Sequence, residues 1–518
     1  MITVDFSKRG GAGLCDFLCD SIRAQIRGGQ LTADEKLPSK RALASHLGVS
    51  VITVQNAYEQ LIGEGYIYSI EKKGFFVTDI ALESAPAAAP TFPSTSLGAP
   101  STTPQSPSTA EEAYSTTARP PSTAPSLFFD FRNNATSSER FPFSQWAHEM
   151  RSVLSAGDQK LLQRQTVSGI YELRLAISRY LASFRNMQVT PEQIIIGAGT
   201  ESLYSMLVQF FGSGKKIAVE NPGYHKIAKI FEANGARAIP VQIDQQGIPP
   251  QLLEQNQIDI IHISPSHHFP TGRVMPIRRR LELLNWAEQA PGRYIIEDDY
   301  DSEFRFAGKP LPTMQASGTD RVIYVNTFSK TIAPSFRISY MILPPALTGD
   351  FQKKLGFYSC PVSAFEQFTL AHFIDDGLYE RHLIRMKNYY RNLRNAFIYA
   401  LEKSRISPLL TIQEEEAGLH FLLSFKTPQS GDQLKSAFLA QGLNLPLLSE
   451  FYYRRDYEEA VTGKQGSTIS PPNFEPGPGS ASAPLPGART FVINYSALEK
   501  EKIPAVVKRM ESALQCKV

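Results

Sequence analysis

The chain has 518 residues, of which 42% are hydrophobic and 20% are charged, and its formal net charge is +3. This length exceeds one ordinary domain, and the composition is that of a soluble globular protein with two or three folded units. No apolar run approaches the roughly 20 residues that span a bilayer, and the first residues lack the pattern of a secretion signal. We therefore expect a cytoplasmic protein with no membrane partner.

The four cysteines are too few and too scattered for a disulfide framework, so we expect reduced thiols. Residues 1 to 78 contain nine Lys or Arg and eight Asp or Glu, a balance of +1. A strongly basic surface is a common mark of nucleic-acid binding, and this segment lacks one. Any DNA-binding role at the start of the chain must therefore rest on its pattern of elements.

The first eighty residues predict three helices and a hairpin. Apolar residues recur at helical spacing from Leu14 until Gly28-Gly29, a pair that ends helices. Ser39 is placed to cap a second helix over residues 40–47, and Gly48 makes a turn before a third helix over residues 51–64. Two short apolar runs around residues 71–74 then predict a hairpin wing. We interpret residues 1–80 as a winged helix-turn-helix domain, with a small helical domain for protein contacts as the alternative.

The partner of such a domain is double-stranded DNA. Its contacts are expected at the start of the second helix, where phosphates lie, along the third helix in the major groove, and on the wing. The residues predicted to make them are Ser39, Arg41, Thr53, Gln55, Lys72 and Lys73.

Residues 81–126 change character, because Ala, Pro, Ser and Thr dominate and almost nothing there can bury a core. We predict a flexible linker, followed by a second folded body over residues 127–518. Apolar runs at residues 193–197, 258–263, 294–297 and 322–325 alternate with amphipathic helices, which predicts a large α/β domain over about 185–345 with a largely parallel sheet.

After about residue 343 the pattern shifts to long helices and then to strands near residues 418–425 and 491–495. This change predicts a smaller α+β lobe over about 346–518. Residues 462–489 are rich in Gly, Pro and Ser and are interpreted as a mobile insertion in that lobe.

Polar motifs follow several of the predicted strands of the body. A glycine-rich turn at residues 197–201 opens a helix over residues 202–211, so backbone N–H groups and the helix dipole can hold a phosphate there. Asp298 follows another apolar strand, Lys330 follows the next, and Arg337 lies seven residues further on. A lysine for an aldehyde, an anion for a ring nitrogen and donors for a phosphate are what pyridoxal phosphate requires.

These motifs also fit other kinds of site. A lone lysine after a strand is usually a surface residue, and Glu297-Asp298-Asp299 also suits a metal site or a solvated loop. His267 and His268 are adjacent, but no third metal ligand lies at diagnostic spacing. We therefore interpret the two histidines as turn residues near a cofactor and predict no metal.

The body resembles a fold type I aminotransferase of class I, and the chain from about residue 8 to 515 resembles the MocR group of the GntR family of regulators. The resemblance is carried by residues 265–272, 297–304 and 327–330 in the body, and by 37–41, 48–50 and 53–55 in the head. It implies that Lys330 is the Schiff-base lysine, that Asp298 pairs with the ring nitrogen and that Tyr300 reaches the phenolate oxygen. The other residues expected around the cofactor are Gly199, Thr200, Glu201, Tyr224 (stacking on the ring), Thr327 and Arg337 (holding the phosphate).

Three positions of the body depart from the aminotransferase pattern. Phe269 stands where these enzymes have an asparagine, and Val492 stands where they usually have an arginine for the substrate carboxylate. Arg164 stands where many relatives have a tyrosine that reaches the phosphate of the partner subunit. These departures disfavour efficient turnover of ordinary α-amino acids.

Three hypotheses follow. The first is a homodimeric transcriptional regulator in which pyridoxal phosphate, or its adduct with an amine or amino acid, changes DNA binding from its site at Lys330. The second is an active aminotransferase with an autoregulatory or vestigial head, and the third is a non-catalytic scaffold. No residue selects the effector, the operator or the sign of regulation.

Overall fold

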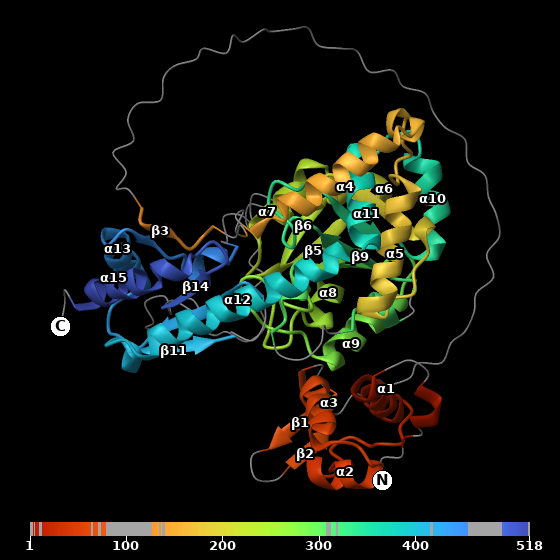
Figure 1. The fold of residues 1–518 in the computed structure, drawn as a ribbon. Coiled ribbons are helices and arrows are strands. Elements are labelled where there is room, and N and C mark those ends of the chain that lie inside the picture. The colour runs from red at the N-terminus through yellow and green to blue at the C-terminus, as the bar shows by residue number, and fades with distance from the viewer. Residues whose placement is uncertain are drawn as a thin grey trace, which may run out of the picture.

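A computed structural model describes the chain at residues 4, 6–9, 13–63, 66–70, 74–78, 127–133, 136, 140–306, 312–317, 320–414, 418–453 and 489–515. The predicted linker (81–126), the predicted DNA contacts Lys72 and Lys73, and residues 462–488 of the predicted insertion lie outside the described residues. Figure 1 traces the chain from the head, in red, through the body to the C-terminal helix, in blue.

The predicted helices and wing of the head are confirmed. They are α1 (Leu14–Arg27), α2 (Lys40–Leu47), α3 (Val51–Gly63), β1 (Ile67–Ile70) and β2 (Gly74–Val77). The Ser39 hydroxyl accepts the Ala42 N–H at 3.2 Å, and the Ser50 hydroxyl accepts the Thr53 N–H at 3.0 Å. These bonds satisfy N–H groups that a helix start leaves unpaired, which is why α2 and α3 begin where they do. Strands β1 and β2 pair antiparallel, so the wing is a hairpin.

The body is built on a seven-stranded sheet in the order β4-β10-β9-β8-β7-β5-β6. The strands are β4 (Ile194–Gly197), β5 (Lys216–Asn221), β6 (Arg237–Gln242), β7 (Ile260–Ile263), β8 (Tyr294–Asp298), β9 (Val322–Thr327) and β10 (Ser339–Ile342). Strands β5 to β9 run parallel to one another, whereas β10 runs antiparallel to both β4 and β9. The predicted, largely parallel sheet is thus confirmed.

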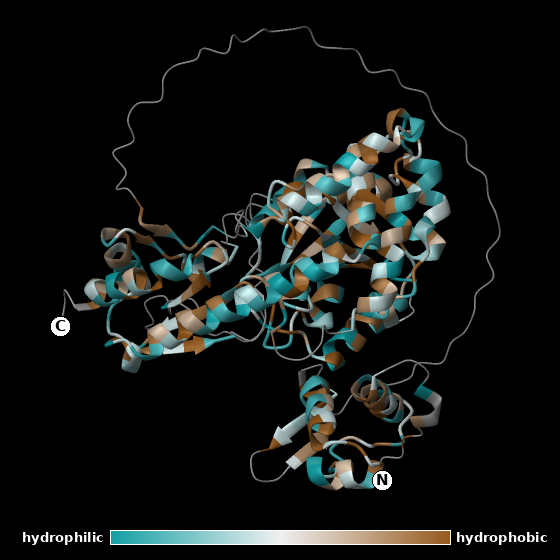
Figure 2. Cartoon of the chain, viewed as in Figure 1, coloured by the Kyte–Doolittle hydropathy of each residue, from teal (hydrophilic) through white to brown (hydrophobic). Residues whose placement is uncertain are grey.

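Helices cover both faces of this sheet, because successive strand residues point to opposite sides. Ile260 packs with α6 (Thr200–Phe211), α7 (His225–Ala233) and α10 (Pro345–Leu355) on one face. Ile261 packs on the other face with α8 (Pro250–Gln255) and α9 (Ile277–Glu288). That face continues under α4 (Phe143–Ala156), α5 (Tyr171–Arg185) and α11 (Ala364–Asp375). Figure 2 shows that the covering helices carry both hydrophilic and hydrophobic residues, as amphipathic helices do.

A smaller lobe has its own core around an antiparallel sheet in the order β11-β12-β14. Its elements are α12 (Leu378–Glu402), β11 (Leu410–Gln413), β12 (His420–Phe425), α13 (Gly431–Ala440), β13 (Leu443–Asn444), β14 (Thr490–Asn494) and α15 (Ile503–Gln515). The short strand β3 (Phe129–Asp130) joins this lobe by pairing with β13. Helices α10 and α11 pack against the large sheet, so the predicted boundary near residue 346 falls before two helices of the large domain.

The head lies against helix α9 of the body (Figure 1). Ile277, the first residue of α9, is 8% exposed and belongs to the same buried cluster as the head core, and Leu281 packs against that cluster one turn later. None of the helices in the described parts of the chain combines the length and the apolar character that a membrane crossing requires.

Candidate cofactor pocket and DNA-reading surface

A cavity of about 400 Å³ opens at the carboxyl ends of the central strands. Most of the predicted cofactor residues line it, although the motifs lie up to 137 positions apart in the chain. Those in the wall are Thr200, Glu201, Tyr224, Asp298, Tyr300, Thr327, Lys330 and Arg337. The position is the one where open α/β sheets bind ligands, because loops diverge at the ends of parallel strands.

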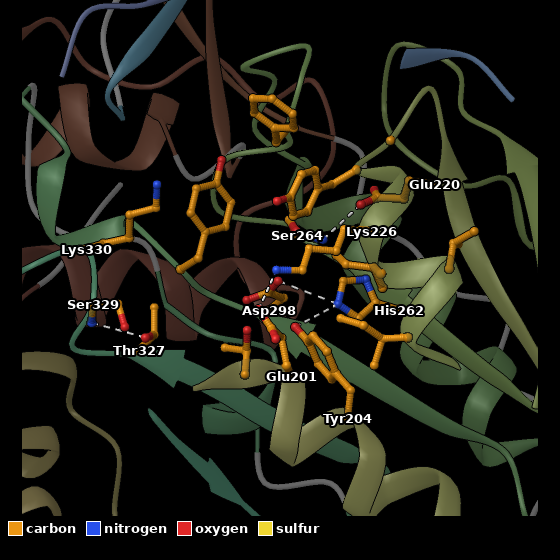
Figure 3. A pocket seen from close by; sticks show the side chains of 18 of the residues that line it. Glu201, Tyr204, Glu220, Lys226, His262, Ser264, Asp298, Thr327, Ser329 and Lys330 are labelled. Carbon is orange, nitrogen blue, oxygen red and sulfur yellow. Dashed lines mark hydrogen bonds and ion pairs between the residues drawn. The ribbon is translucent and has the colours of Figure 1, made fainter. Parts of the chain in front are cut away.

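Lys330 lies on a tight turn after β9 and points into the cavity (Figure 3). The turn is held by Thr327, whose hydroxyl accepts the Ser329 N–H at 3.1 Å and the Ser339 hydroxyl at 2.8 Å. Burial lowers the pKa of Lys330 to about 8, and the carboxylates of Asp301 and Asp298 oppose that shift. A larger fraction of this amine is therefore neutral near pH 7 than for an ordinary lysine, and the neutral amine is the nucleophile.

Asp298, the last residue of β8, is 7% exposed and faces the same cavity. Its Oδ2 lies 3.6 Å from Nε2 of His262, and His262 Nε2 lies 3.1 Å from the Tyr204 hydroxyl. Its other oxygen, Oδ1, is buried and has no hydrogen-bond partner among the described residues. A buried carboxylate oxygen without a donor is costly, so this atom fits a protonated ring nitrogen of a bound group.

The start of α6 forms another wall of the cavity. Gly199, which caps this helix, has φ of +82°, and a Cβ there would collide with the guanidinium of Arg337. Glu201 in the first turn contacts Lys226 and, at 3.4 Å, Arg337. These contacts lower the pKa of Glu201, that with Lys226 most strongly. Backbone N–H groups and two cations thus meet at one helix N-terminus, an arrangement suited to phosphate.

Two predicted tyrosines line the cavity. Burial, followed by the charge of Asp301, raises the pKa of Tyr300 well above its usual value, so its hydroxyl stays protonated and can donate a hydrogen bond. The Tyr300 hydroxyl lies 3.2 Å from Nδ1 of His267. The ring of Tyr224 is 50% exposed and stands edge-on to Phe269, with centroids 5.8 Å apart. Stacking of Tyr224 on a cofactor stays a prediction.

Among the polar residues of the wall that sequence reasoning missed are Tyr204, Glu220 and His262. Each lies within an apolar helix or strand, where the signal is one polar residue in a hydrophobic run. Burial raises the pKa of Glu220 to about 8, and it lowers that of the neighbouring His268 to about 3. The Glu220 carboxyl accepts the Ser264 N–H at 3.0 Å. The cavity thus holds a carboxyl that is mostly protonated at pH 7.

The head presents α3 to solvent. Gln55 is exposed, and its side chain donates to Glu59 at 2.9 Å on the same helix. Thr53 is partly buried, and its hydroxyl lies 2.8 Å from that of Ser50 in the helix cap. Ser39 and Arg41 are exposed at the start of α2. Ile52 is 70% exposed near the start of α3, a position that sequence reasoning did not select.

The fold and the two sites define a winged helix-turn-helix head joined to a fold type I aminotransferase body. Residues 14–77 match the model of bacterial regulatory proteins of the gntR family, and residues 130–459 match that of aminotransferase class I and II. A Thermococcus profundus multiple substrate aminotransferase has a TM-score of 0.60 and 23% identity, covering 74% of this chain and 91% of its own.

Curated relatives align over both parts. The HTH-type transcriptional regulator YdeL of Bacillus subtilis is 36% identical, covering 84% of this chain and 89% of the relative. The probable rhizopine catabolism regulatory protein MocR of Rhizobium meliloti is 31% identical, covering 87% and 89%. The pyridoxine biosynthesis regulator PdxR of Corynebacterium glutamicum is 30% identical, covering 84% and 88%. The chain therefore belongs to the MocR-type transcriptional regulators of the GntR family, with a DNA-binding head and a body of the fold that uses pyridoxal phosphate.

Proposed function

We propose that pyridoxal phosphate binds in the cavity at Lys330 and that its state there sets how the protein binds DNA. The observation that carries this proposal is the pairing of Lys330 with Asp298, whose Oδ1 is buried without a donor among the described residues. One relative is named for regulation of pyridoxine biosynthesis and another for rhizopine catabolism, so the effector is either the cofactor itself or an amine that reacts with it.

The residues that line the cavity bind different parts of the cofactor in this proposal. Bound pyridoxal phosphate supplies an aldehyde that reacts with amines and a ring that withdraws electrons. The Lys330 amine holds the aldehyde end, and Asp298 keeps a proton on the ring nitrogen, with Tyr204 and His262 positioning its carboxylate. The Tyr300 hydroxyl donates to the phenolate oxygen. Thr200, the N-terminus of α6 and Arg337 hold the phosphate, which then competes with Glu201 for Arg337.

A homodimer is part of the proposal. Leu162 is 82% exposed and Phe357 is 67% exposed. Arg164 ties their segments together, because its Nη2 donates to the Phe357 carbonyl at 3.0 Å. Large apolar side chains that are exposed on adjoining segments favour an interaction surface there. We infer that a second copy covers them, and sedimentation of Leu162→Glu and Phe357→Glu, alone and together, should show a shift from dimer to monomer.

The domain limits and the DNA contacts belong to the same proposal. Residues 1–80 form the reader, 81–126 the linker and 127–518 the effector body. Gln55 and Thr53 on α3 face the major groove, and Arg41 with Ser39 meets phosphates. We infer that the protein works in the cytoplasm, because the family that the head matches is bacterial and bacterial DNA lies there.

A regulator is favoured over an efficient enzyme by the place where aminotransferases bind the substrate carboxylate. Val492 there is fully buried in an apolar cluster with Leu422 and Leu448, so this position offers no positive charge to a substrate carboxylate. Steady conversion of an amino acid and keto acid pair by the purified protein would instead support the aminotransferase hypothesis.

The test is a footprint of the full-length protein on DNA upstream of its own and adjacent genes, with the cofactor stripped and then restored. We expect protection that changes with pyridoxal phosphate in the wild type and does not change in Lys330→Ala. Lys229→Ala, an exposed lysine on α7 outside the cavity wall, is the matched control and should respond as the wild type does. A cofactor response that persists in Lys330→Ala would contradict the proposed site.

A further inference from the structure

A second cluster of chemically active side chains lies beside the cofactor pocket, at the junction of the two lobes of the body. His267 lies in the turn after β7, Asp301 lies in the loop after β8, and His420 is the first residue of β12 in the smaller lobe. These side chains are 3%, 3% and 2% exposed. One possible ligand atom from each lies within 4.8 Å of the others.

Each of the two histidines has a buried ring nitrogen without a hydrogen-bond partner in the described part of the chain. Nδ1 of His267 lies 2.9 Å from Oδ2 of Asp301, but its Nε2 is buried and has no hydrogen bond with any described residue. Nε2 of His420 is in the same situation. A buried polar atom without a partner is costly, so Nε2 of His420 is available to a group that is not part of the chain. His267 would face the same group with Nδ1, the nitrogen beside Asp301.

Close packing by neighbouring residues holds the three side chains of the cluster in place. A Cβ on Gly418 would collide with the ring of His267, so only glycine lets the smaller lobe approach so closely. The Gly418 carbonyl accepts the Tyr495 hydroxyl at 2.7 Å, and its N–H donates to the Phe304 carbonyl at 3.1 Å. The ring of Phe269 lies 5.2 Å from that of His420 and shields the cluster on that side.

We propose that His267, Asp301 and His420 bind a divalent transition-metal ion, with Zn²⁺ as the expected occupant, and so clamp the smaller lobe onto the large domain. Two imidazoles and one carboxylate are a ligand set of zinc and of non-haem iron, whereas magnesium and calcium prefer oxygen ligands alone. Ligands of a tetrahedral zinc ion lie roughly 3.3–3.5 Å from one another, a spacing that this cluster reaches with small side-chain movements. The fourth position is left to water, because the Tyr300 hydroxyl beside His267 Nδ1 is assigned to the cofactor.

The separation along the chain explains why no sequence motif marks this site. His267 and Asp301 come from neighbouring loops of the large domain, but His420 comes from another lobe 153 positions after His267. The adjacent His268 takes no part, because its Nδ1 lies 2.7 Å from the Thr271 hydroxyl in its own turn.

The test uses the full chain, stripped of metal with a chelator and then titrated with Zn²⁺ against a chromophoric competitor. We expect one tight site per chain in the wild type. His420→Gln and Asp301→Asn should weaken binding at least about 100-fold, since even outer-shell partners of metal ligands are worth about 10- to 100-fold. Co²⁺ provides a second probe, because its visible absorption bands reveal a tetrahedral site directly.

Three controls keep the result unambiguous. His372→Gln removes an exposed histidine of α11 and should bind Zn²⁺ as the wild type does. Lys330→Ala should also keep the site, so failure of the cofactor proposal and failure of this one are separable. Asp301→Asn preserves side-chain shape and serves if His420→Gln does not fold. A stripped, folded wild type without a tight Zn²⁺ site, or equal affinities in Asp301→Asn and wild type, would show that the cluster is a hydrogen-bond network only and overturn the proposal.

Discussion

Replacing Glu220 with glutamine tests the electrostatics of the pocket, because this carboxyl is buried and its pKa is raised from 4.5 to about 8. Burial is the main cause, the negative charge of Asp298 adds to it, and the Ser264 N–H opposes it. His268, whose Nε2 lies 3.6 Å from Glu220 Oε2, has a pKa lowered from 6.5 to about 3 by burial. The pair is therefore a neutral acid beside a neutral imidazole at pH 7.

The sign of the pH dependence follows from these shifts. A raised folded-state pKa means that Glu220 contributes stability below pH 4.5 that is lost as pH rises toward about 8. The lowered pKa of His268 acts in the opposite sense, because stability is lost as pH falls below 6.5. Between pH 4.5 and 6.5 the two effects on the free energy of unfolding cancel. Above pH 6.5 only Glu220, of these two residues, changes the stability with pH. At about 1.4 kcal/mol per pKa unit, the loss from Glu220 between pH 6.5 and 8 is about 1.5–2 kcal/mol.

The assay is urea unfolding at pH 6.5 and pH 8, followed by tryptophan fluorescence. Both tryptophans, Trp146 and Trp286, lie in the body, so the signal reports the unit that contains Glu220. Glu297 and Glu303 also have raised pKa values of about 7, but they contribute equally to wild type and variant.

We expect the free energy of unfolding to fall less between the two pH values in Glu220→Gln than in the wild type, by the amount given above. Glu288→Gln changes an exposed carboxylate on α9 and should keep the wild-type slope. Identical slopes for Glu220→Gln and wild type would mean that the carboxyl is already ionised in the folded protein, and the reasoning would fail.

Three further perturbations follow from the structure. Arg185 forms a fully buried ion pair with Asp299, so Asp299→Asn should destabilise the body by about 3–5 kcal/mol, measured by urea unfolding; a change below about 1 kcal/mol would contradict this. Gly199→Ala should weaken binding of pyridoxal phosphate at least tenfold, measured by dialysis, because its methyl group displaces Arg337; equal affinity would contradict that arrangement. Ile277→Glu should release the head from α9 and increase the radius of gyration in small-angle scattering, whereas an unchanged radius would show that the contact is not maintained in solution.

Local signals were enough to predict the head. Ser39 and Ser50 cap their helices as expected, because an N-cap needs only its own side chain and the next turn of backbone. The alternation of apolar strands and amphipathic helices likewise predicted the central sheet. The antiparallel course of β10 was not predicted, since strand direction depends on pairing between distant segments.

The pocket residues that follow the end of a strand could be predicted from the sequence. Those that reach the cavity from within a helix or strand could not. Asp298 and Lys330 follow apolar runs and stand out by position. His262 lies within β7 and Glu220 within β5, where only the three-dimensional arrangement shows that they face the same cavity. His420 required the packing of one lobe on another, which no pattern in the sequence encodes.

Helix α9 contacts the head with some of its residues and, with others, the turn after β7 that carries His267 and Phe269. Arg280 of this helix donates to the carbonyls of Pro265 and Met275 at 2.9 and 3.0 Å, and these residues bracket the turn that carries His267 and Phe269. Ile277 and Leu281 meet the head from the same helix. A pocket ligand that moves this turn therefore changes the strength of the contact between the head and α9. If ligand binding changes the affinity for the operator by some factor, operator binding must change the affinity for the ligand by the same factor. The DNA site would therefore help to set the ligand concentration to which the protein responds.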